Sequence, residues 1–385
     1  MPATKSEKAL RYLFDGFSRR EDHGDIWAGS EMVSVGPTDL PVPPLVLFLL
    51  TEVMGMIKLG LDEKTAWHVP VQFRGHRVTI ANQKFGLRFF VIPAEGSDET
   101  AEAIAAEVAR RLGKALRIVE REVLAKHARQ QLDEGRLTLA NQSGRQRAMY
   151  EHFRESATAA FAVAEKPETP EGRDAVDSIF AGVFEKIHQS QVGAWEAIAA
   201  VNAYFSLLEH ELVLISAFSD LDPTGGALED LIGDRWGEKF RKLFDLEAAE
   251  TKGVYDRLHE IAETYRNPYS HGGFDKQGTA LWFHLDGIGA VPARLSDIRS
   301  SPHFELFPVQ PDGFVTICAD LDYTDRWLRN GRYSAGFEWI DAGLDVAFDE
   351  ESRGDYQRLA DDPQYRRNLI ERRQHLTDRA VNFDW

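Results

Sequence analysis

Apolar residues recur every three or four positions along much of this chain, and that spacing predicts helices. Two strong patterns follow a charged stretch with two prolines at 166–172, which we interpret as a linker. The first pattern comprises Val176, Ile179, Phe180, Val183, Phe184 and Ile187. The second comprises Val201, Phe205, Leu208, Leu212 and Ile215. With further helical sequence up to Tyr265, the region 173–267 predicts an all-α bundle built from two long helices and shorter ones.

The N-terminal part mixes helical and strand patterns. The apolar run 45–61 contains charged residues at 52 and 58, which favours a core helix over a membrane span. Apolar and polar residues alternate over 69–93, which predicts a β-hairpin with its turn at Asn82-Gln83. From a cap at Ser97-Asp98, helical spacing returns and predicts a long amphipathic helix. Its apolar face would comprise Ile104, Val108, Leu112, Ala115, Val119 and Val123.

The last part of the chain returns to strand composition before it ends in helices. Residues 279–295 and 303–321 are rich in apolar residues, with Gly and Pro turns, and predict a small β-element. The fold class expected is therefore mainly α, a helical bundle with an N-terminal α+β region and a small β-element after it. The segments expected are 1–97 (α+β), 98–165 (long helices), 173–278 (bundle), 279–320 (β-element) and 321–385 (C-terminal helices).

Composition narrows the function classes. The 385 residues include 45 Lys or Arg and 62 Asp or Glu, a net charge of −17, which excludes a protein that coats nucleic acid or an anionic membrane with its whole surface. Between 235 and 276, however, basic and acidic residues balance. The one cysteine, Cys318, cannot form an internal disulfide, and the first residues lack a signal-peptide core, so we expect a cytoplasmic protein.

The stretch YRNPYSHGGF at 265–274 carries the strongest candidate chemistry. One interpretation is a helix stop, because Pro268 disfavours helical backbone before it and two glycines supply turns. The other is a site that cleaves RNA without metal. Such a site must move protons, which His271 can do, and must hold charge on phosphorus, which the planar guanidinium of Arg266 can do. Asn267 could then orient the histidine.

The order Arg-Asn-x3-His at the end of a helical bundle resembles the motif of the HEPN superfamily, with Arg266, Asn267 and His271 at its three positions. The resemblance covers roughly residues 173–275. It implies a helical homodimer and, in many members, metal-independent endoribonuclease activity used in toxins, antiviral defence or RNA processing. Other members act as binding or dimerisation modules. An Arg-x4-His spacing also occurs at Arg147 and His152, inside a charged helix, and we take that copy as chance.

Further residues complete the expected site. Gly272 and Gly273 would let backbone approach a substrate, and Tyr269 and Lys276 are candidate substrate contacts. Glu209 and His210 could face the motif as supporting residues, although a solvated helix edge is the other interpretation.

Metal chemistry is not expected. Zinc-ligand spacing is absent from the sequence, and neither a metal nor a cofactor is predicted. The acidic stretch 320–325, with Asp320, Asp322 and Asp325, is interpreted as a capped helix start rather than a magnesium site.

The leading hypothesis is a homodimeric, metal-independent endoribonuclease that acts on RNA. One histidine cannot be both acid and base in one step, so the second copy of the chain would supply another. The N-terminal region or a regulatory protein partner would restrain the site, and no membrane partner is expected. The alternative is a non-catalytic dimerisation module that binds a nucleotide or a protein carboxylate. A plain helical scaffold is the third hypothesis.

Overall fold

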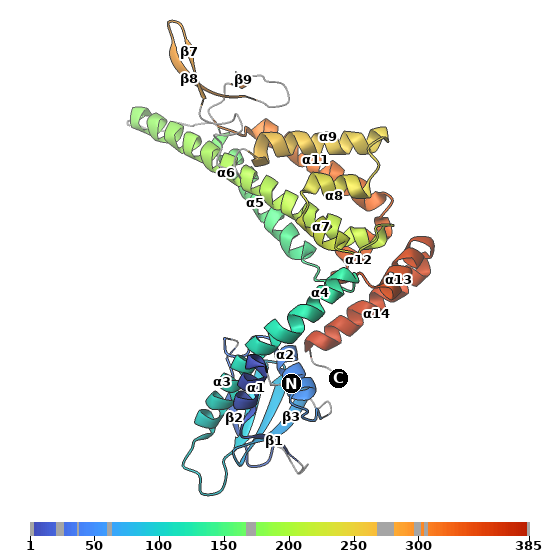
Figure 1. Cartoon of the computed structure of the whole chain (residues 1–385). Helices are drawn as coiled ribbons and strands as arrows, with labels where there is room; N and C mark the ends of the chain where they lie inside the picture. Colours follow the sequence, from blue (N-terminus) through green and yellow to red (C-terminus); the bar gives the residue numbers. More distant parts are fainter. Residues whose placement is uncertain are drawn as a thin grey trace. The chain divides into compact units, whose positions relative to one another are not determined.

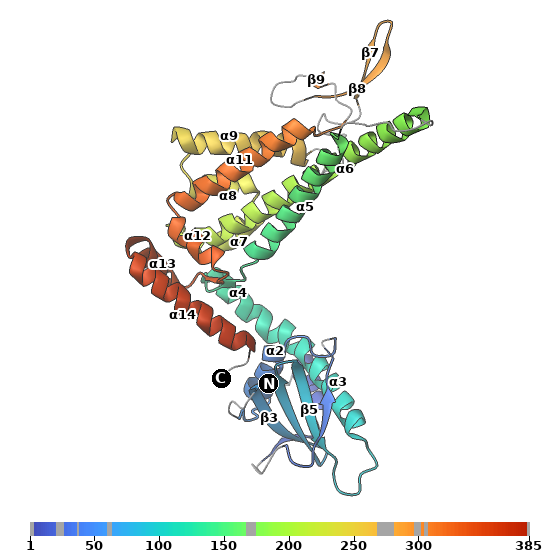
Figure 2. The same cartoon turned by 180° about the vertical axis from the view of Figure 1, so that it is seen from behind.

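The computed structural model describes residues 4–20, 27–36, 38–59, 64–166, 175–267, 281–295, 302–303 and 307–382 (Figures 1 and 2). The fold is 64% helical and 13% strand, which confirms the mainly α class. The chain forms two compact units, one of residues 1–131 with 371–385 and one of residues 132–370. Residues 167–174, which include most of the expected linker, lie outside the described residues.

The first unit is built on a five-stranded antiparallel sheet with the order β1-β3-β4-β5-β2. The strands are β1 (Phe17–Arg19), β2 (Glu31–Ser34), β3 (Thr65–Phe73), β4 (His76–Gln83) and β5 (Gly86–Ile92). The helices are α1 (Lys5–Phe14), α2 (Pro43–Phe48) with the π-helical turn η1 (Leu49–Val53), α3 (Ala101–Val119), η2 (Glu120–Leu124) and α4 (Ala125–Asp133), which runs to the boundary of the unit. Apolar side chains of the sheet, of α2 and of α3 form one core.

The hairpin predicted over 69–93 is wrong, because this segment contributes to three strands. Asn82 and Gln83 lie inside β4, where they pair with Leu87 and Gly86 of β5. The turns fall on either side of β4, at Arg74-Gly75 and at Lys84-Phe85. Arg74 and Gly75 both have positive φ, at 49° and 89°, a conformation that glycine adopts without strain.

The core helix predicted in the run 45–61 is confirmed, although it ends at Val53. In the long helix that follows the sheet, the predicted apolar face from Ile104 to Val119 is buried, but Val123 is exposed. Its cap is Thr100 rather than Ser97-Asp98, since the Thr100 side chain accepts a hydrogen bond from Ala103 N.

The second unit contains the predicted bundle. Its helices are α5 (Ser143–Ala164), α6 (Ala175–Ile215) with η3 (Ser216–Phe218), α7 (Ala227–Gly233), α8 (Trp236–Leu243), α9 (Ala249–Ile261) with the π-helical turn η4 (Ala262–Arg266), α11 (Pro311–Asn330), α12 (Ser334–Asp341), α13 (Glu350–Asp361) and α14 (Pro363–Asn382), which continues past residue 370. Short strands are β6 (Thr138–Leu139), paired with β10 (Val346–Ala347), and the set β7 (Leu281–Leu285), β8 (Gly289–Leu295) and β9 (Pro302–His303).

The two long helices predicted in this unit are one uninterrupted helix, α6, of 41 residues (Figure 1). Its C-terminal pattern from Val201 to Ile215 is buried as the spacing indicates. In its N-terminal pattern, Val183, Phe184 and Ile187 are exposed by 41%, 68% and 43%. The stretch between the two patterns is rich in alanine and contains no proline, so nothing in it ends a helix.

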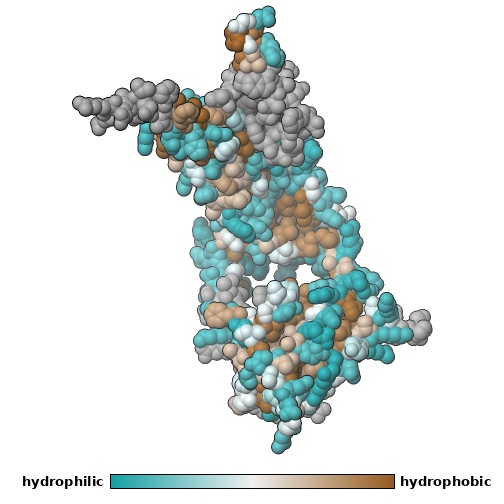
Figure 3. Space-filling view, turned by 90° about the vertical axis from the view of Figure 1, so that its left-hand side faces the viewer, coloured by the Kyte–Doolittle hydropathy of each residue, from teal (hydrophilic) through white to brown (hydrophobic). Residues whose placement is uncertain are grey.

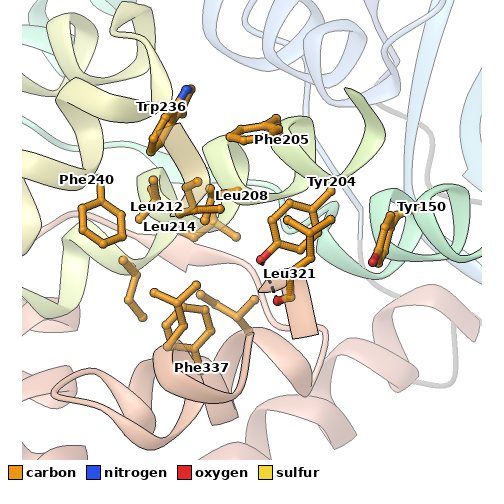
Figure 4. Packing of buried hydrophobic residues seen from close by; sticks show 14 of the residues in the cluster. Tyr150, Tyr204, Phe205, Leu208, Leu212, Leu214, Trp236, Phe240, Leu321 and Phe337 are labelled. Carbon is orange, nitrogen blue, oxygen red and sulfur yellow. Dashed lines mark hydrogen bonds between the residues drawn. The ribbon is translucent and has the colours of Figure 1, made fainter. Parts of the chain in front are cut away.

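Aromatic and leucine side chains from α5, α6, α8, α11 and α12 fill the core of the second unit (Figure 4). Tyr204 lies at its centre, with its hydroxyl 3.0 Å from Asp325 Oδ1 and 3.3 Å from Leu321 O. By length and composition alone, the segment Gly182–Phe218 could cross a membrane, but 72% of its most apolar window is buried inside the protein. Exposed apolar and polar side chains both occur on the face shown in Figure 3.

The β-element is confirmed for 281–295, which forms the β7–β8 hairpin, but not for 303–321. From Pro311 onward that segment is the start of α11, because Phe314, Ile317 and Leu321 share one buried face. The acidic stretch 320–325 therefore lies inside a helix rather than at a capped start. Each of its aspartates faces an arginine: Asp320 faces Arg257 at 3.8 Å, Asp322 faces Arg154 at 2.6 Å, and Asp325 faces Arg147 at 2.8 Å.

Gly193, in the middle of α6, permits close contact with α5. A Cβ at this position would lie 2.6 Å from the ring of Phe161. We expect Gly193→Ala to lower the free energy of unfolding by about 1–3 kcal/mol, since overpacking outweighs the gain in helix propensity. Urea unfolding measures the change. Gly354→Ala in α13 is the control, because nothing lies within 4 Å of its Cβ; it should raise stability by up to about 1 kcal/mol. A gain in both variants would contradict the packing argument.

Candidate functional site

The end of α9 forms one wall of a cleft with a volume of about 590 Å³. This wall carries Tyr255, His259 and Glu263, followed by Arg266 and Asn267. The opposite wall is the segment 233–238 at the start of α8, together with Arg241, and Glu209 of α6 completes the lining. The predicted arginine and asparagine thus lie in a cleft large enough for a nucleotide.

Arg266 is held in place by two contacts with α6. Its Nη2 donates to Glu209 Oε1 at 2.9 Å, and its guanidinium carbon lies 5.1 Å from the centre of the Phe205 ring. The side chains of Arg266 and Glu209 are both partly exposed, by 23% and 28%. Of the two interpretations of Glu209, contact with the motif is therefore the one that the structure supports.

The side chain of Asn267 bonds a residue of its own helical segment. Its Nδ2 donates to Glu263 Oε1, one turn earlier, at 2.7 Å. The amide therefore has a defined orientation, and its carbonyl oxygen remains an acceptor at the edge of the cleft. Tyr269, His271, Gly272, Gly273 and Lys276 lie outside the described residues, so their predicted roles remain predictions.

His210 does not line this cleft. It contacts the start of α5, where its Nε2 accepts the Gln142 N–H at 2.9 Å. Because that nitrogen accepts, the imidazole is neutral and carries its proton on Nδ1. Burial lowers the pKa of His210, since it disfavours the charged form. His210 therefore positions α5.

Three residues of the cleft were missed by sequence reasoning: Arg235, Arg241 and His259. Arg241 bonds Glu238 and the hydroxyl of Tyr255, while the ring of His259 lies 5.9 Å from that of Tyr255. No ion pair of Arg235 occurs among the described residues, and its side chain is exposed. The signal for His259 was present, because it precedes Arg266 by seven residues and so shares a helix face with it.

Each carboxylate of the cleft has a partner. Glu209 pairs with Arg266 and Glu238 with Arg241, while Asp234 pairs with Lys242 at 2.6 Å and Glu263 accepts from Asn267. Three of these acids are therefore neutralised by a cation, whereas Glu263 keeps its charge beside a neutral amide. The arrangement can bind an anionic ligand through Arg235 and the remaining N–H groups of Arg266.

The lowered pKa of His210 predicts a pH dependence of stability. The unfolded chain takes up this proton near pH 6.5 and the folded chain only at lower pH, so the contribution of His210 is complete above 6.5 and is lost as the pH falls. His210→Gln keeps an acceptor for Gln142 N–H but does not titrate. The stability difference between wild type and variant, from urea unfolding, should therefore shift against wild type between pH 7 and pH 5. A difference that is constant with pH would show that His210 titrates normally in the fold.

Comparison with known proteins adds no assignment to the cleft. No protein-family model, curated protein or solved structure matches this chain.

Proposed function

We propose that this protein is a metal-independent endoribonuclease of the HEPN type, active as a cytoplasmic homodimer in a toxin or antiviral defence setting. The observation that carries the proposal is the cleft at the end of α9, where Arg266 and Asn267 lie together with Arg235 and Arg241. Arginine matches phosphate oxygens through paired N–H groups, and RNA presents such oxygens along its backbone.

Cleavage would proceed by attack of a 2′-oxygen on the neighbouring phosphorus. A base removes the 2′-hydroxyl proton, the new bond from the 2′-oxygen to phosphorus forms, and the bond to the 5′-oxygen breaks as an acid donates a proton to it. The products are a 2′,3′-cyclic phosphate and a free 5′-hydroxyl. Arg266 would stabilise the charge on the phosphorane and His271 would transfer one of the protons, with Asn267 positioned by Glu263 beside them.

The second proton transfer needs a second group. A symmetric copy of the chain can supply its own His271. His259 offers another source, since it lines the same cleft as Arg266 and its side chain makes no hydrogen bond among the described residues. Both sources keep the reaction free of metal.

One contact favours the alternative, a non-catalytic module that dimerises and binds a nucleotide or a protein carboxylate. Arg266 is already neutralised by Glu209 and packs on Phe205, so it also stabilises the bundle. An arginine with only this structural role would make the same contacts in a protein that catalyses no reaction.

The nuclease is tested with total RNA in EDTA. We expect cutting that leaves cyclic phosphate ends and falls by at least about 100-fold in His271→Ala, the usual loss when an acid–base group is removed. His152→Ala is the matched control, because His152 is an exposed histidine on α5 outside the cleft. Equal activity in wild type and His271→Ala would contradict the proposed nuclease. RNA binding without cutting would support the binding module.

The role of His259 is tested separately with His259→Gln. If it supplies the second proton, activity should fall by about 100-fold, and one limb of the pH–rate profile should be lost. Cutting rates measured from pH 5 to pH 9 show the effect. An unchanged profile would assign the second proton transfer to the partner copy's own motif.

A further inference from the structure

A second cleft, of about 600 Å³, lies where α5 begins. It is lined by the first turns of α5, the last turns of α11 and the end of α12, through Ser143, Gly144, Arg147, Asp325, Arg326, Arg329, Asn330, Ile340, Asp341 and Gly343. None of its lining residues is shared with the cleft at Arg266. The interpretation of Arg147 as a chance repeat of the motif spacing leaves its position here unexplained.

Two arginines of this cleft are fixed by carboxylates, of which Glu211 is buried. Arg147 donates to Asp325 at 2.8 Å and to Glu211 at 3.2 Å. Arg329 donates to the same Glu211 oxygen and to Asp341, both at 2.9 Å. Glu211 is only 1% exposed, so it lies behind the arginines and holds both. The three carboxylates outnumber the two arginines by one charge, and they set the orientation of the arginines before any ligand arrives.

Two further sources of positive charge offset the extra carboxylate. Arg326 lines the cleft, is exposed and makes no ion pair among the described residues. The first turn of α5 also lines it, and a helix of 22 residues carries about half a positive charge at its N-terminus, where the first N–H groups have no partner within the helix. Both features favour an anion.

Unpartnered polar atoms provide the independent indication of a ligand. Ser143 is 4% exposed, yet its Oγ makes no hydrogen bond. Nη1 of Arg329 is also buried without a hydrogen bond, and lies 3.8 Å from Asp325 Oδ1. A buried polar group without a partner is costly, and both of these groups can donate. An acceptor with several oxygens that enters between α5 and α11 would satisfy them together.

We propose that this cleft binds a phosphate monoester, with the phosphate between the start of α5, Arg326 and Arg329. A phosphate offers only acceptors, and helix N-termini together with arginine are the groups that bind it most often. The volume leaves room for the organic part of a ligand the size of a nucleotide. The site is independent of the proposed nuclease reaction, since it shares no residue with it.

Isothermal titration calorimetry of the full chain with adenosine 5′-monophosphate, inorganic phosphate and adenosine tests the proposal. We expect both phosphates to bind and adenosine to bind much more weakly. Arg326→Ala should weaken binding by about tenfold or more, as expected for a lost charged hydrogen bond. Arg145→Ala is the matched control, because it also removes one exposed positive charge, from the first turn of α5 beside the cleft, but Arg145 does not line the cleft.

Ser143→Ala separates a ligand contact from a structural role. Removal of an unpartnered hydroxyl should leave the melting temperature of the free protein unchanged or higher, while phosphate binding weakens by about tenfold. The proposal is overturned if neither phosphate binds, if adenosine binds as well as its monophosphate, or if Arg145→Ala matches Arg326→Ala. A loss of binding in Arg266→Ala instead would place the phosphate in the other cleft and overturn it too. RNA cutting by these variants is a separate measurement, so either proposal can fail alone.

Discussion

The second unit depends on a buried carboxylate, Glu211, near the C-terminal end of its longest helix. The residue is 1% exposed and accepts hydrogen bonds from Arg147 of α5 and Arg329 of α11. Burial raises the pKa of Glu211, and Arg329 and Arg147 oppose that rise. Removal of one partner from such a network would leave an uncompensated buried charge. The three helices are therefore fixed to one another by charge as well as by apolar packing.

The two residues before Glu211 also link α6 to neighbouring elements through polar contacts. Successive side chains on a helix point about 100° apart, so three consecutive polar residues reach three different neighbours. Glu209 holds Arg266 at the end of α9, His210 holds the backbone that precedes α5, and Glu211 joins α5 to α11. The tripeptide Glu-His-Glu thereby positions one wall of each cleft. A single turn of α6 sets the geometry of both candidate sites.

Sequence patterns predicted what local spacing determines. The buried face from Val201 to Ile215 and the helical end that presents Arg266 follow directly from apolar residues three and four apart. The exposure of Phe184 could not be predicted, because the sequence pattern of an apolar helix face is the same whether or not another element covers that face. The strand prediction for the segment that forms α11 was wrong. Val, Ile and Phe favour strands in general, but here they repeat with the 3.6-residue period of a helix and pack against the bundle.

Some residues of the two candidate sites could be predicted from the sequence, and others could not. The motif residues Arg266 and Asn267 were recognisable from their order along the chain, and Glu209 was recognisable as a neighbour. Arg235 and Arg241 were not, since they come from another helix and only the fold brings them to the end of α9. The cleft at Ser143 brings α5 together with α11 and α12, which lie far from it in sequence. Its most informative atoms are buried groups without a hydrogen bond, and no sequence pattern predicts such groups.

The strong acidity of the chain and a phosphate-binding cleft are compatible on electrostatic grounds. Charges on the protein surface are screened beyond about 8 Å at physiological ionic strength, so a net charge of −17 acts weakly on a ligand seated among nearby arginines. Arg266 has five N–H donors and gives one to Glu209, which leaves the others for phosphate oxygens. Its pairing with Glu209 lowers the local positive charge but fixes the guanidinium in position, so recognition would rest on directed hydrogen bonds. Nonspecific attraction to a polyanion would be weak, and selection of a phosphate would depend on the shape of the cleft.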